Sequence, residues 1–303
     1  MIALLLVTKN ESDLLRLNLL HHLGWGFDEI AVADNMSTDG SADVVREIGS
    51  PVRYRRFSNF HDRQTLRHEM LHEIFRSGCV EGDWAAIADT DEFFWSSEDL
   101  RQILASVPDD IVAVNFDAKL FLPTAVDPPS GTVLQRRTYR STGPDSPLHT
   151  SYSAGKTLYR ASWLMSLPVD HWCKNHEHLC IDVPHERYRH QVALVHHYMI
   201  QDEEQFVEKV VRLIEWAKPP RGFRKALKWR VTPKAARPLP PWSEPWKKEW
   251  WSVYQRDGVA GVRDYYRNVY VIPADRVEEH VAAGDLVRDD ALATYHHATL
   301  DSA

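Results

Sequence analysis

The first half of the chain alternates between short apolar runs and more polar, amphipathic segments. Apolar runs of strand length occupy residues 2–7, 29–33, 52–57, 84–89 and 111–116, and segments with helical patterning lie between them at about 10–24, 41–47 and 63–75. Alternation of strands and helices at this spacing indicates right-handed βαβ units. The pattern therefore predicts an α/β fold, Rossmann-like, with a mainly parallel central sheet flanked by helices.

Local signals place the ends of several elements. Asn10, with Asp13 three positions later, is typical of a helix start, and Gly24 is typical of a helix stop. The elements predicted beyond residue 122 are loops and short hairpins at 123–155, strands at 156–160 and 192–198, and a helix that Asp202 caps. The sheet is thus predicted to continue into the second half of the chain.

The composition changes after Trp216. Residues 218–237 contain many Lys and Arg and no Asp or Glu, and residues 238–251 are dense in Pro and Trp. We predict one domain over 1–217 and a mostly helical C-terminal extension over 218–303. The basic and tryptophan side chains indicate either attachment to an anionic membrane surface or packing of the tryptophans over the sheet, and the prolines favour packing. A basic groove for a polyanion is the third interpretation.

The overall composition limits the class of protein. The chain has 303 residues, 44% of them hydrophobic and 26% charged, and a net charge of −7, so nucleic acid is not an expected partner. Three cysteines are typical of a reducing compartment. The apolar run at 2–7 lacks a basic flank and predicts a strand, not a signal peptide. We expect a cytoplasmic protein, with the inner face of the membrane as the alternative placement.

The most informative segment is the strand that ends in Asp89 and Asp91. Apolar residues bury this strand, which delivers two carboxylates to its carboxyl end, where open α/β sheets bind ligands. Mg²⁺ is usually held in proteins by one or two carboxylates while phosphates complete its shell. The segment therefore predicts a metal–diphosphate site, although a solvated acidic turn is the simpler alternative.

An ordered set of motifs resembles the family 2-type glycosyltransferases with a GT-A fold. The segments that carry the resemblance are residues 7–11, 33–41, 89–93 (DxDEF) and 197–209, where His-Tyr is followed by a helix with Phe206 and Lys209. The resemblance covers about residues 1–215. It implies a GT-A domain that binds a nucleotide-sugar and transfers its sugar, and nothing recognisable covers 218–303.

The resemblance implies roles for individual residues. The implied donor-binding residues are Thr8, Asn10, Glu11, Asp34, Asn35, Arg63, Asp89 and Lys156. The implied metal ligands are Asp89, Asp91 and His197, with Mn²⁺ or Mg²⁺ as the cofactor and Glu92 in support. His196 and His197 alternate on a strand, so only one of them faces the site. Turn chemistry, an exposed helix start and a structural histidine are the alternatives for these residues.

The catalytic base is expected from the middle third of the chain. Asp170 and Glu177 are the two candidates, and the residues alone do not choose between them. The same stretch offers a zinc alternative, because Cys173, His176, His178 and Cys180 are zinc-type ligands, but their spacing does not match common zinc sites.

The resulting hypothesis is a metal-dependent, inverting glycosyltransferase of the hexosyltransferase type. Its expected donor is a UDP- or GDP-sugar, and its expected acceptor is a hydroxyl of a glycan or of a lipid-linked molecule. The alternatives are a sugar-phosphate nucleotidyltransferase and a non-catalytic sugar-binding protein. A nucleotidyltransferase usually has a Gly-rich basic loop after the first strand, which residues 8–11 do not form.

Overall fold

The computed structural model describes residues 1–57, 83–142, 148, 155–166, 183–216 and 245–299. The chain forms two compact units, the first from residues 1–120, 152–199 and 290–303 and the second from residues 121–151 and 200–289. The predicted boundary between residues 217 and 218 lies outside the described residues and stays a prediction. The compact units are a different division, because each of them combines segments that are far apart in the sequence.

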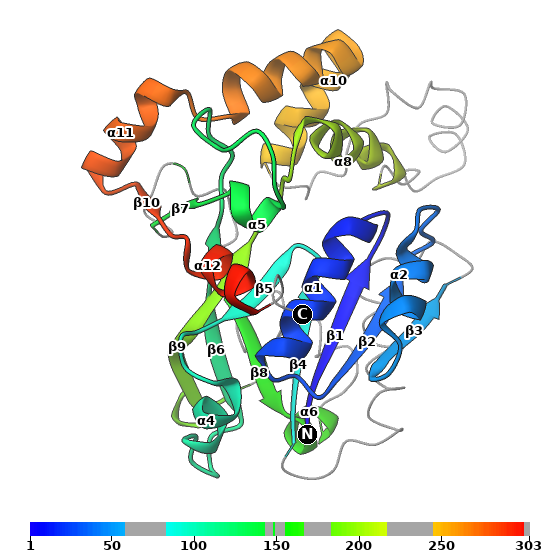
Figure 1. Ribbon diagram of the computed structural model, residues 1–303, viewed down its shortest axis with the longest axis vertical. Helices are drawn as coiled ribbons and strands as arrows, with labels where there is room; N and C mark the ends of the chain where they lie inside the picture. Colours follow the sequence, from blue (N-terminus) through cyan, green and yellow to red (C-terminus); the bar gives the residue numbers. More distant parts are fainter. Residues whose placement is uncertain (58–82, 143–147, 149–154, 167–182, 217–244, 300–303) are drawn as a thin grey trace, which may run out of the picture. The chain divides into compact units, whose positions relative to one another are not determined.

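The first unit is an α/β structure built on one large sheet (Figure 1). Its strands are β1 (Ile2–Thr8), β2 (Glu29–Asp34), β3 (Val52–Arg56), β4 (Trp84–Asp89), β5 (Glu92–Trp95), β6 (Ala113–Leu120), β8 (Lys156–Arg160) and β9 (Tyr188–His197). Its helices are α1 (Ser12–Trp25), α2 (Ser41–Ile48), α4 (Leu100–Ala105), α6 (Ala161–Ser166) and α12 (Ala291–Thr299), with a 3₁₀ turn at His185–Arg187.

The described residues form this sheet from eight strands in the order β3-β2-β1-β4-β8-β6-β9-β5. The neighbours among β3, β2, β1 and β4 are parallel, as are β6 and β9, whereas β8 is antiparallel to both of its neighbours and β5 is antiparallel to β9. Parallel pairings are thus the majority, and the predicted α/β fold with a mainly parallel sheet is confirmed. The parallel strands also bring their carboxyl ends to one edge.

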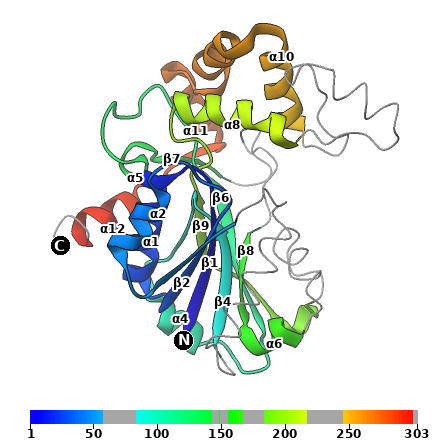
Figure 2. The same ribbon diagram turned by 90° about the vertical axis from the view of Figure 1, so that its right-hand side faces the viewer.

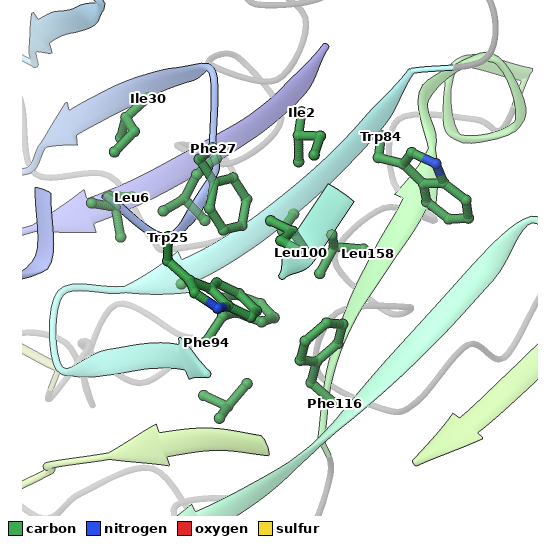
Figure 3. Packing of buried hydrophobic residues seen from close by; sticks show 14 of the residues in the cluster. Ile2, Leu6, Trp25, Phe27, Ile30, Trp84, Phe94, Leu100, Phe116 and Leu158 are labelled. Atoms are coloured by element: carbon green, nitrogen blue, oxygen red, sulfur yellow. The ribbon is translucent and has the colours of Figure 1, made fainter. Parts of the chain in front are cut away.

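Hydrophobic cores lie on both faces of the sheet. Successive residues of β1 belong to opposite cores. Leu4 and Leu6 pack on one face with α1, α2 and α4, and Leu5 packs on the other face near α6. Figure 2 shows α1, α2 and α12 on the same face. The larger core continues through aromatic residues, among them Trp25, Phe94 and Phe116, whose side chains gather over the strands (Figure 3). This burial on both faces of the sheet explains why the sequence of β1 is a continuous apolar run.

The start of α1 differs from the prediction. The helix begins at Ser12 with Glu11 as its N-cap and without a side-chain cap, because Asn10 adopts a left-handed backbone (φ 53°) and uses its side chain elsewhere. The helix ends at Trp25, and Gly26, at φ 117°, takes the left-handed C-cap that Gly24 was predicted to provide. The first error comes from tertiary contacts of Asn10 that local patterning does not contain.

The second unit contains most of the described C-terminal part. Its elements are α5 (Val133–Arg136), β7 (Tyr139–Ser141), α8 (Glu203–Trp216), α10 (Pro245–Tyr265), the π-helical turn Tyr266–Tyr270, α11 (Ala274–Ala283) and β10 (Leu286–Arg288). The described part of the predicted extension is therefore mainly helical. Asp202 caps α8 as predicted, since its carboxylate accepts the N–H of Gln205 at 2.9 Å. Residues 123–142 contain α5 and β7 as well as the predicted loops.

Two tryptophans of α10 pack inside the second unit. Trp250 and Trp251 are buried, and the Trp250 ring lies 4.7 Å from the ring of Phe206 between centroids. Packing therefore accounts for these two side chains without a membrane. The basic residues at 218–237 and Trp242 lie outside the described residues. Within the described part of the chain, no helix has both the length and the apolar character that a bilayer crossing requires.

Candidate functional site

Three parallel strands of the first unit end in polar residues at one edge of the sheet. The register aligns Thr8 of β1 with Asp34 of β2, and it aligns Val7 with Asp89 of β4. The predicted residues Thr8, Asp34 and Asp89 therefore lie on neighbouring strands, at the edge where open α/β sheets bind ligands.

The two loops that leave β1 and β2 are hydrogen-bonded to each other. The Asn10 side-chain oxygen accepts the N–H of Thr38 at 2.7 Å, and the Asn10 N–H donates to Ser37 Oγ at 2.9 Å. Asp39 accepts the N–H of Ser12 at 2.9 Å. Both Asn10 and Met36 have positive φ, which costs free energy in residues other than glycine. These hydrogen bonds fix the backbone of the predicted turn at 34–40. We call this turn, together with Asn10, the wall of the site.

Asp34 stabilises this wall. Its carboxylate is fully buried, accepts the N–H of Ser37 at 2.6 Å and accepts the hydroxyl of Tyr54. Burial raises the pKa of Tyr54, and the hydrogen bond to Asp34 raises it further. Both Asp34 oxygens are therefore engaged within the protein, which gives this residue a structural task besides the predicted contact with a donor.

Two buried polar atoms at the same edge lack a hydrogen-bond partner among the described residues. They are Thr8 Oγ1 and Asn35 Oδ1, and the two residues are adjacent because the Asn35 N–H donates to the Thr8 carbonyl at 3.0 Å. A buried polar atom without a partner costs free energy, so such atoms are typically satisfied by water or by a ligand. Their position at the ends of β1 and β2 is the position predicted for nucleoside contacts.

A cluster of four buried charged or ionisable side chains lies at the ends of β4, β5, β8 and β9. It consists of Asp91, Glu92, Lys156 and His197, each at most 9% exposed. Glu92 and His197 are cross-strand partners on β5 and β9. The Lys156 ammonium lies 3.0 Å from Glu92 Oε1, and His197 Nε2 lies 3.6 Å from Asp91 Oδ1. We call these four residues the acidic-edge cluster.

The acidic-edge cluster shifts the pKa of His197. Burial disfavours the charged imidazolium, but the carboxylate of Asp91, and to a smaller extent that of Glu92, outweighs burial, so the pKa of His197 is raised above its ordinary value. His196 is also buried and lies on the opposite face of β9, as strand alternation requires. The structure therefore brings His197, not His196, to Asp91.

The cluster fits a metal site in which the protein supplies few ligands. Among the described residues, no group of three or more His, Cys, Asp or Glu side chains is arranged to hold a metal ion, so Asp89, Asp91 and His197 do not form a ready three-ligand site. Asp91 and His197 are the two predicted ligands that lie together. A carboxylate and an imidazole, completed by the phosphates of a bound nucleotide, remain chemically suited to Mn²⁺ or Mg²⁺.

Some of the predicted site residues cannot be located in the structure. Arg63, Asp170 and Glu177 lie outside the described residues, as do the cysteines and histidines of the zinc alternative. Glu11 is described, and it is the N-cap residue of α1, next to the wall formed by the two loops.

A cavity of about 580 Å³ lies at the opposite edge of the sheet. It is lined by Met1, Gly49 and Pro51 among others.

Sequence reasoning missed three polar residues behind the site. Asn18, His21 and His22 of α1 are fully buried and contact the backbone of residues 90–94. The signal was present, because positions i, i+3 and i+4 of a helix share one face, and a polar face buried within an apolar helix is unusual.

These histidines predict a pH dependence of stability. Burial lowers the pKa of His22 to about 3, and burial together with His22 lowers the pKa of His21. The unfolded chain therefore binds more protons than the folded protein below pH 6.5, and the free energy of unfolding should fall by up to about 1.4 kcal/mol per pH unit for each histidine. The measurement is the urea midpoint between pH 7.5 and 5, and His22→Gln should reduce the slope. A His22→Gln variant whose midpoint depends on pH in the same way as that of the unmodified protein would contradict the neutral assignment of His22.

The sequence and the structure were compared with known proteins. No family model matches the sequence, and no curated protein matches it. One similar solved structure is that of TarS residues 1–349 from S. aureus, at 12% identity and a TM-score of 0.40 over 88% of this chain and 91% of that chain. Another is glucosyl-3-phosphoglycerate synthase from Mycobacterium tuberculosis in complex with Mn²⁺, UDP and glucosyl-3-phosphoglycerate, at 16% identity and a TM-score of 0.38 over 70% of this chain and 77% of that chain. These identities and TM-scores are too low to assign a function to this chain.

Proposed function

We propose that this protein is a metal-dependent glycosyltransferase with a GT-A fold, which moves a hexosyl group from a UDP- or GDP-sugar to a hydroxyl of a glycan or lipid-linked acceptor. The observation that carries the proposal is the acidic-edge cluster at the carboxyl edge of the sheet. Its Asp91 belongs to the DxDEF segment and its His197 belongs to the His-Tyr segment. Two motifs that are distant in the sequence therefore meet, with His197 Nε2 at 3.6 Å from Asp91 Oδ1.

The parts of the edge suit the parts of a nucleotide-sugar. The partnerless atoms of Thr8 and Asn35 suit the donors of a base or ribose. Asp91 and His197 suit a divalent cation at the diphosphate. When bound, such a cation stabilises the charge that develops on the departing nucleoside diphosphate. Hydrogen bonds between Asn10 and residues 37–38 fix the two loops beside the partnerless atoms to each other.

The chemistry expected of the protein is a single displacement. The acceptor hydroxyl loses its proton to a carboxylate, its oxygen forms a bond to the anomeric carbon, and the bond from that carbon to the diphosphate breaks. Asp170 and Glu177 are the proposed bases, and Arg63 is proposed to contact the diphosphate. Inversion at the anomeric carbon is part of the proposal, as are peripheral association with a membrane and the domain boundary at 217/218.

Binding of UDP together with Mn²⁺ is the first experimental test. A ligand present at 100 times its Kd stabilises the folded state by about 2.7 kcal/mol, so Mn²⁺ and UDP together should raise the melting temperature by several degrees. Either component alone should raise it less, because the cation is expected to bridge protein and diphosphate. Absence of any shift with UDP, GDP or their sugar derivatives at millimolar concentration would contradict the proposal.

Product analysis separates the alternatives. Incubation with nucleotide-sugars and Mn²⁺ should release nucleoside diphosphate, slowly with water and faster with an acceptor. Release of pyrophosphate from a nucleoside triphosphate and a sugar phosphate would indicate a nucleotidyltransferase. Binding without turnover across a panel of acceptors would indicate a sugar-binding protein.

A further inference from the structure

One face of α1 carries three buried polar side chains, Asn18, His21 and His22, all of them 0% exposed. Burial of amide and imidazole groups is costly unless each finds a partner. The partners of this face therefore indicate what the face is for. Apolar residues of the same helix, such as Leu15 and Leu19, instead pack into the core.

Asn18 holds the two carbonyls that flank Asp91. Its side-chain nitrogen donates to the carbonyl oxygen of Thr90 at 2.9 Å and to that of Glu92 at 2.8 Å. One amide group with two donors thus bridges the turn between β4 and β5. Asp91 lies between the two bridged residues, so the bridge fixes the backbone from which its carboxylate projects.

The two histidines hold the backbone of Phe94 in β5 through opposite tautomers. His22 Nε2 accepts the N–H of Phe94 at 3.1 Å, which requires the proton on Nδ1, and Nδ1 lies 2.8 Å from the side-chain oxygen of Asn18. His21 Nε2 lies 2.7 Å from the Phe94 carbonyl oxygen, which only accepts, so Nε2 of this ring carries the proton. His22 also fixes Asn18, because its Nδ1–H donates to the amide oxygen and leaves the amide nitrogen pointing to the turn.

The opposite side of the turn is held as well. The Asp91 carbonyl oxygen accepts the N–H of Tyr198 at 2.8 Å, and the Asp89 N–H donates to Glu92 Oε2 at 2.8 Å. Thr90 Oγ1 donates to the Val7 carbonyl at 2.9 Å. The carbonyls of residues 90, 91 and 92 are therefore all engaged, and the backbone of the turn has little freedom to rotate.

We propose that Asn18, His21 and His22 are positioning residues, which hold the turn 89–94 so that the Asp91 carboxylate stays beside His197 in the orientation that binds the cation and the diphosphate. The proposal rests on the proposed function for the identity of the ligand, whereas the contacts of the face do not depend on it. The alternative is a purely structural role, in which the three side chains only satisfy an edge strand.

The test compares Asn18→Leu with Leu19→Ala. Leucine keeps the bulk of Asn18 and removes the bridge, whereas Leu19→Ala removes a buried apolar side chain of the same helix and none of the hydrogen bonds to the turn. Two measurements are made on the full chain: the Kd of UDP in the presence of Mn²⁺ by calorimetry, and amide hydrogen exchange of the peptide 84–95. Loss of groups that orient a metal ligand typically weakens metal binding 10–100-fold.

We expect Asn18→Leu to weaken UDP binding with Mn²⁺ about 10–100-fold and to accelerate exchange in residues 89–95 by about tenfold or more. Leu19→Ala should lower the melting temperature and leave the Kd unchanged. Unchanged binding in Asn18→Leu would overturn the proposal, and so would equal weakening in Leu19→Ala at a similar loss of melting temperature.

A second pair of variants covers the case in which Asn18→Leu does not fold. His22→Gln places an acceptor near the position of Nε2, and His22→Leu does not, so glutamine should retain UDP binding and leucine should lose it. Equal binding by the two variants would overturn the proposal. If the unmodified protein binds no UDP with Mn²⁺, the proposed function fails, and exchange alone decides: unchanged exchange at 89–95 in these variants overturns the positioning role, and local acceleration supports it.

Discussion

Asp91→Asn should reduce the rate of nucleotide-sugar hydrolysis by about 10³-fold or more, equivalent to about 4 kcal/mol of transition-state stabilisation. The substitution removes the charge of one of the two proposed ligands that lie together, 3.6 Å apart. It preserves the size of the side chain and the Asp91 carbonyl, which accepts the Tyr198 N–H. The fold should therefore remain, and the measurement is the release of nucleoside diphosphate at saturating donor and Mn²⁺.

A matched control lies next to the other end of the same strand. Asp83→Asn removes a carboxylate that pairs with the N-terminal amine at 2.7 Å, beside the amino end of β4. It should leave the rate within about twofold, since the pair lies at the end of β4 that is distant from the acidic-edge cluster. Equal rates for Asp91→Asn and the unmodified protein would remove the basis of the proposed function, because that function depends on the Asp91 carboxylate beside His197.

The large-scale fold follows from the sequence pattern for a physical reason. Strands such as β1 are buried on both faces, so their apolar runs are continuous and short, and the intervening segments have helical periodicity. The location of the site follows in the same way, since a parallel sheet brings the polar ends of its strands to one edge. Thr8, Asp34 and Asp89 were predicted at this edge, and the strand register places them there.

The contacts within the edge could not be predicted in the same way. Asn10 does not cap its helix, because its side chain binds the backbone of residue 38, which is distant in the sequence. Asp34 is engaged by Tyr54, a residue of the next strand. The pairing of Lys156 with Glu92 depends on the order of strands in the sheet, which an antiparallel insertion such as β8 changes. Each of these contacts requires the tertiary structure.

The polar face of α1 illustrates a signal that local patterning misreads. Asn18, His21 and His22 reduce the apolar contrast between the faces of the helix, so α1 reads as weakly amphipathic although seven of its residues are buried, namely Leu14, Leu15, Asn18, Leu19, His21, His22 and Trp25. Their partners are backbone atoms of Thr90, Glu92 and Phe94. The last two residues belong to β5, an edge strand of the sheet that the described residues form. Buried polar residues at helical spacing beside an edge strand thus indicate contacts between the helix and the backbone of that strand, once the strand order is known.

Lys156→Met should be the most destabilising of the single substitutions considered. The Lys156 and Glu92 side chains are 9% and 5% exposed, and their charged groups lie 3.0 Å apart. Removal of the ammonium leaves the Glu92 carboxylate buried without its counter-charge, which typically costs about 3–5 kcal/mol. The measurement is the free energy of unfolding from urea titration, made without metal or nucleotide so that ligand binding does not contribute.

The double variant Lys156→Met/Glu92→Gln distinguishes loss of the ion pair from loss of packing. Glutamine is neutral and its side-chain oxygen still accepts the Asp89 N–H, which Glu92 accepts at 2.8 Å. The double variant should therefore recover about 2 kcal/mol or more of the loss, a strong coupling between neighbouring residues. Additive losses would show that Lys156 does not act through Glu92. Unchanged stability of Lys156→Met together with a raised KM for the nucleotide-sugar would instead support the predicted contact of Lys156 with the donor.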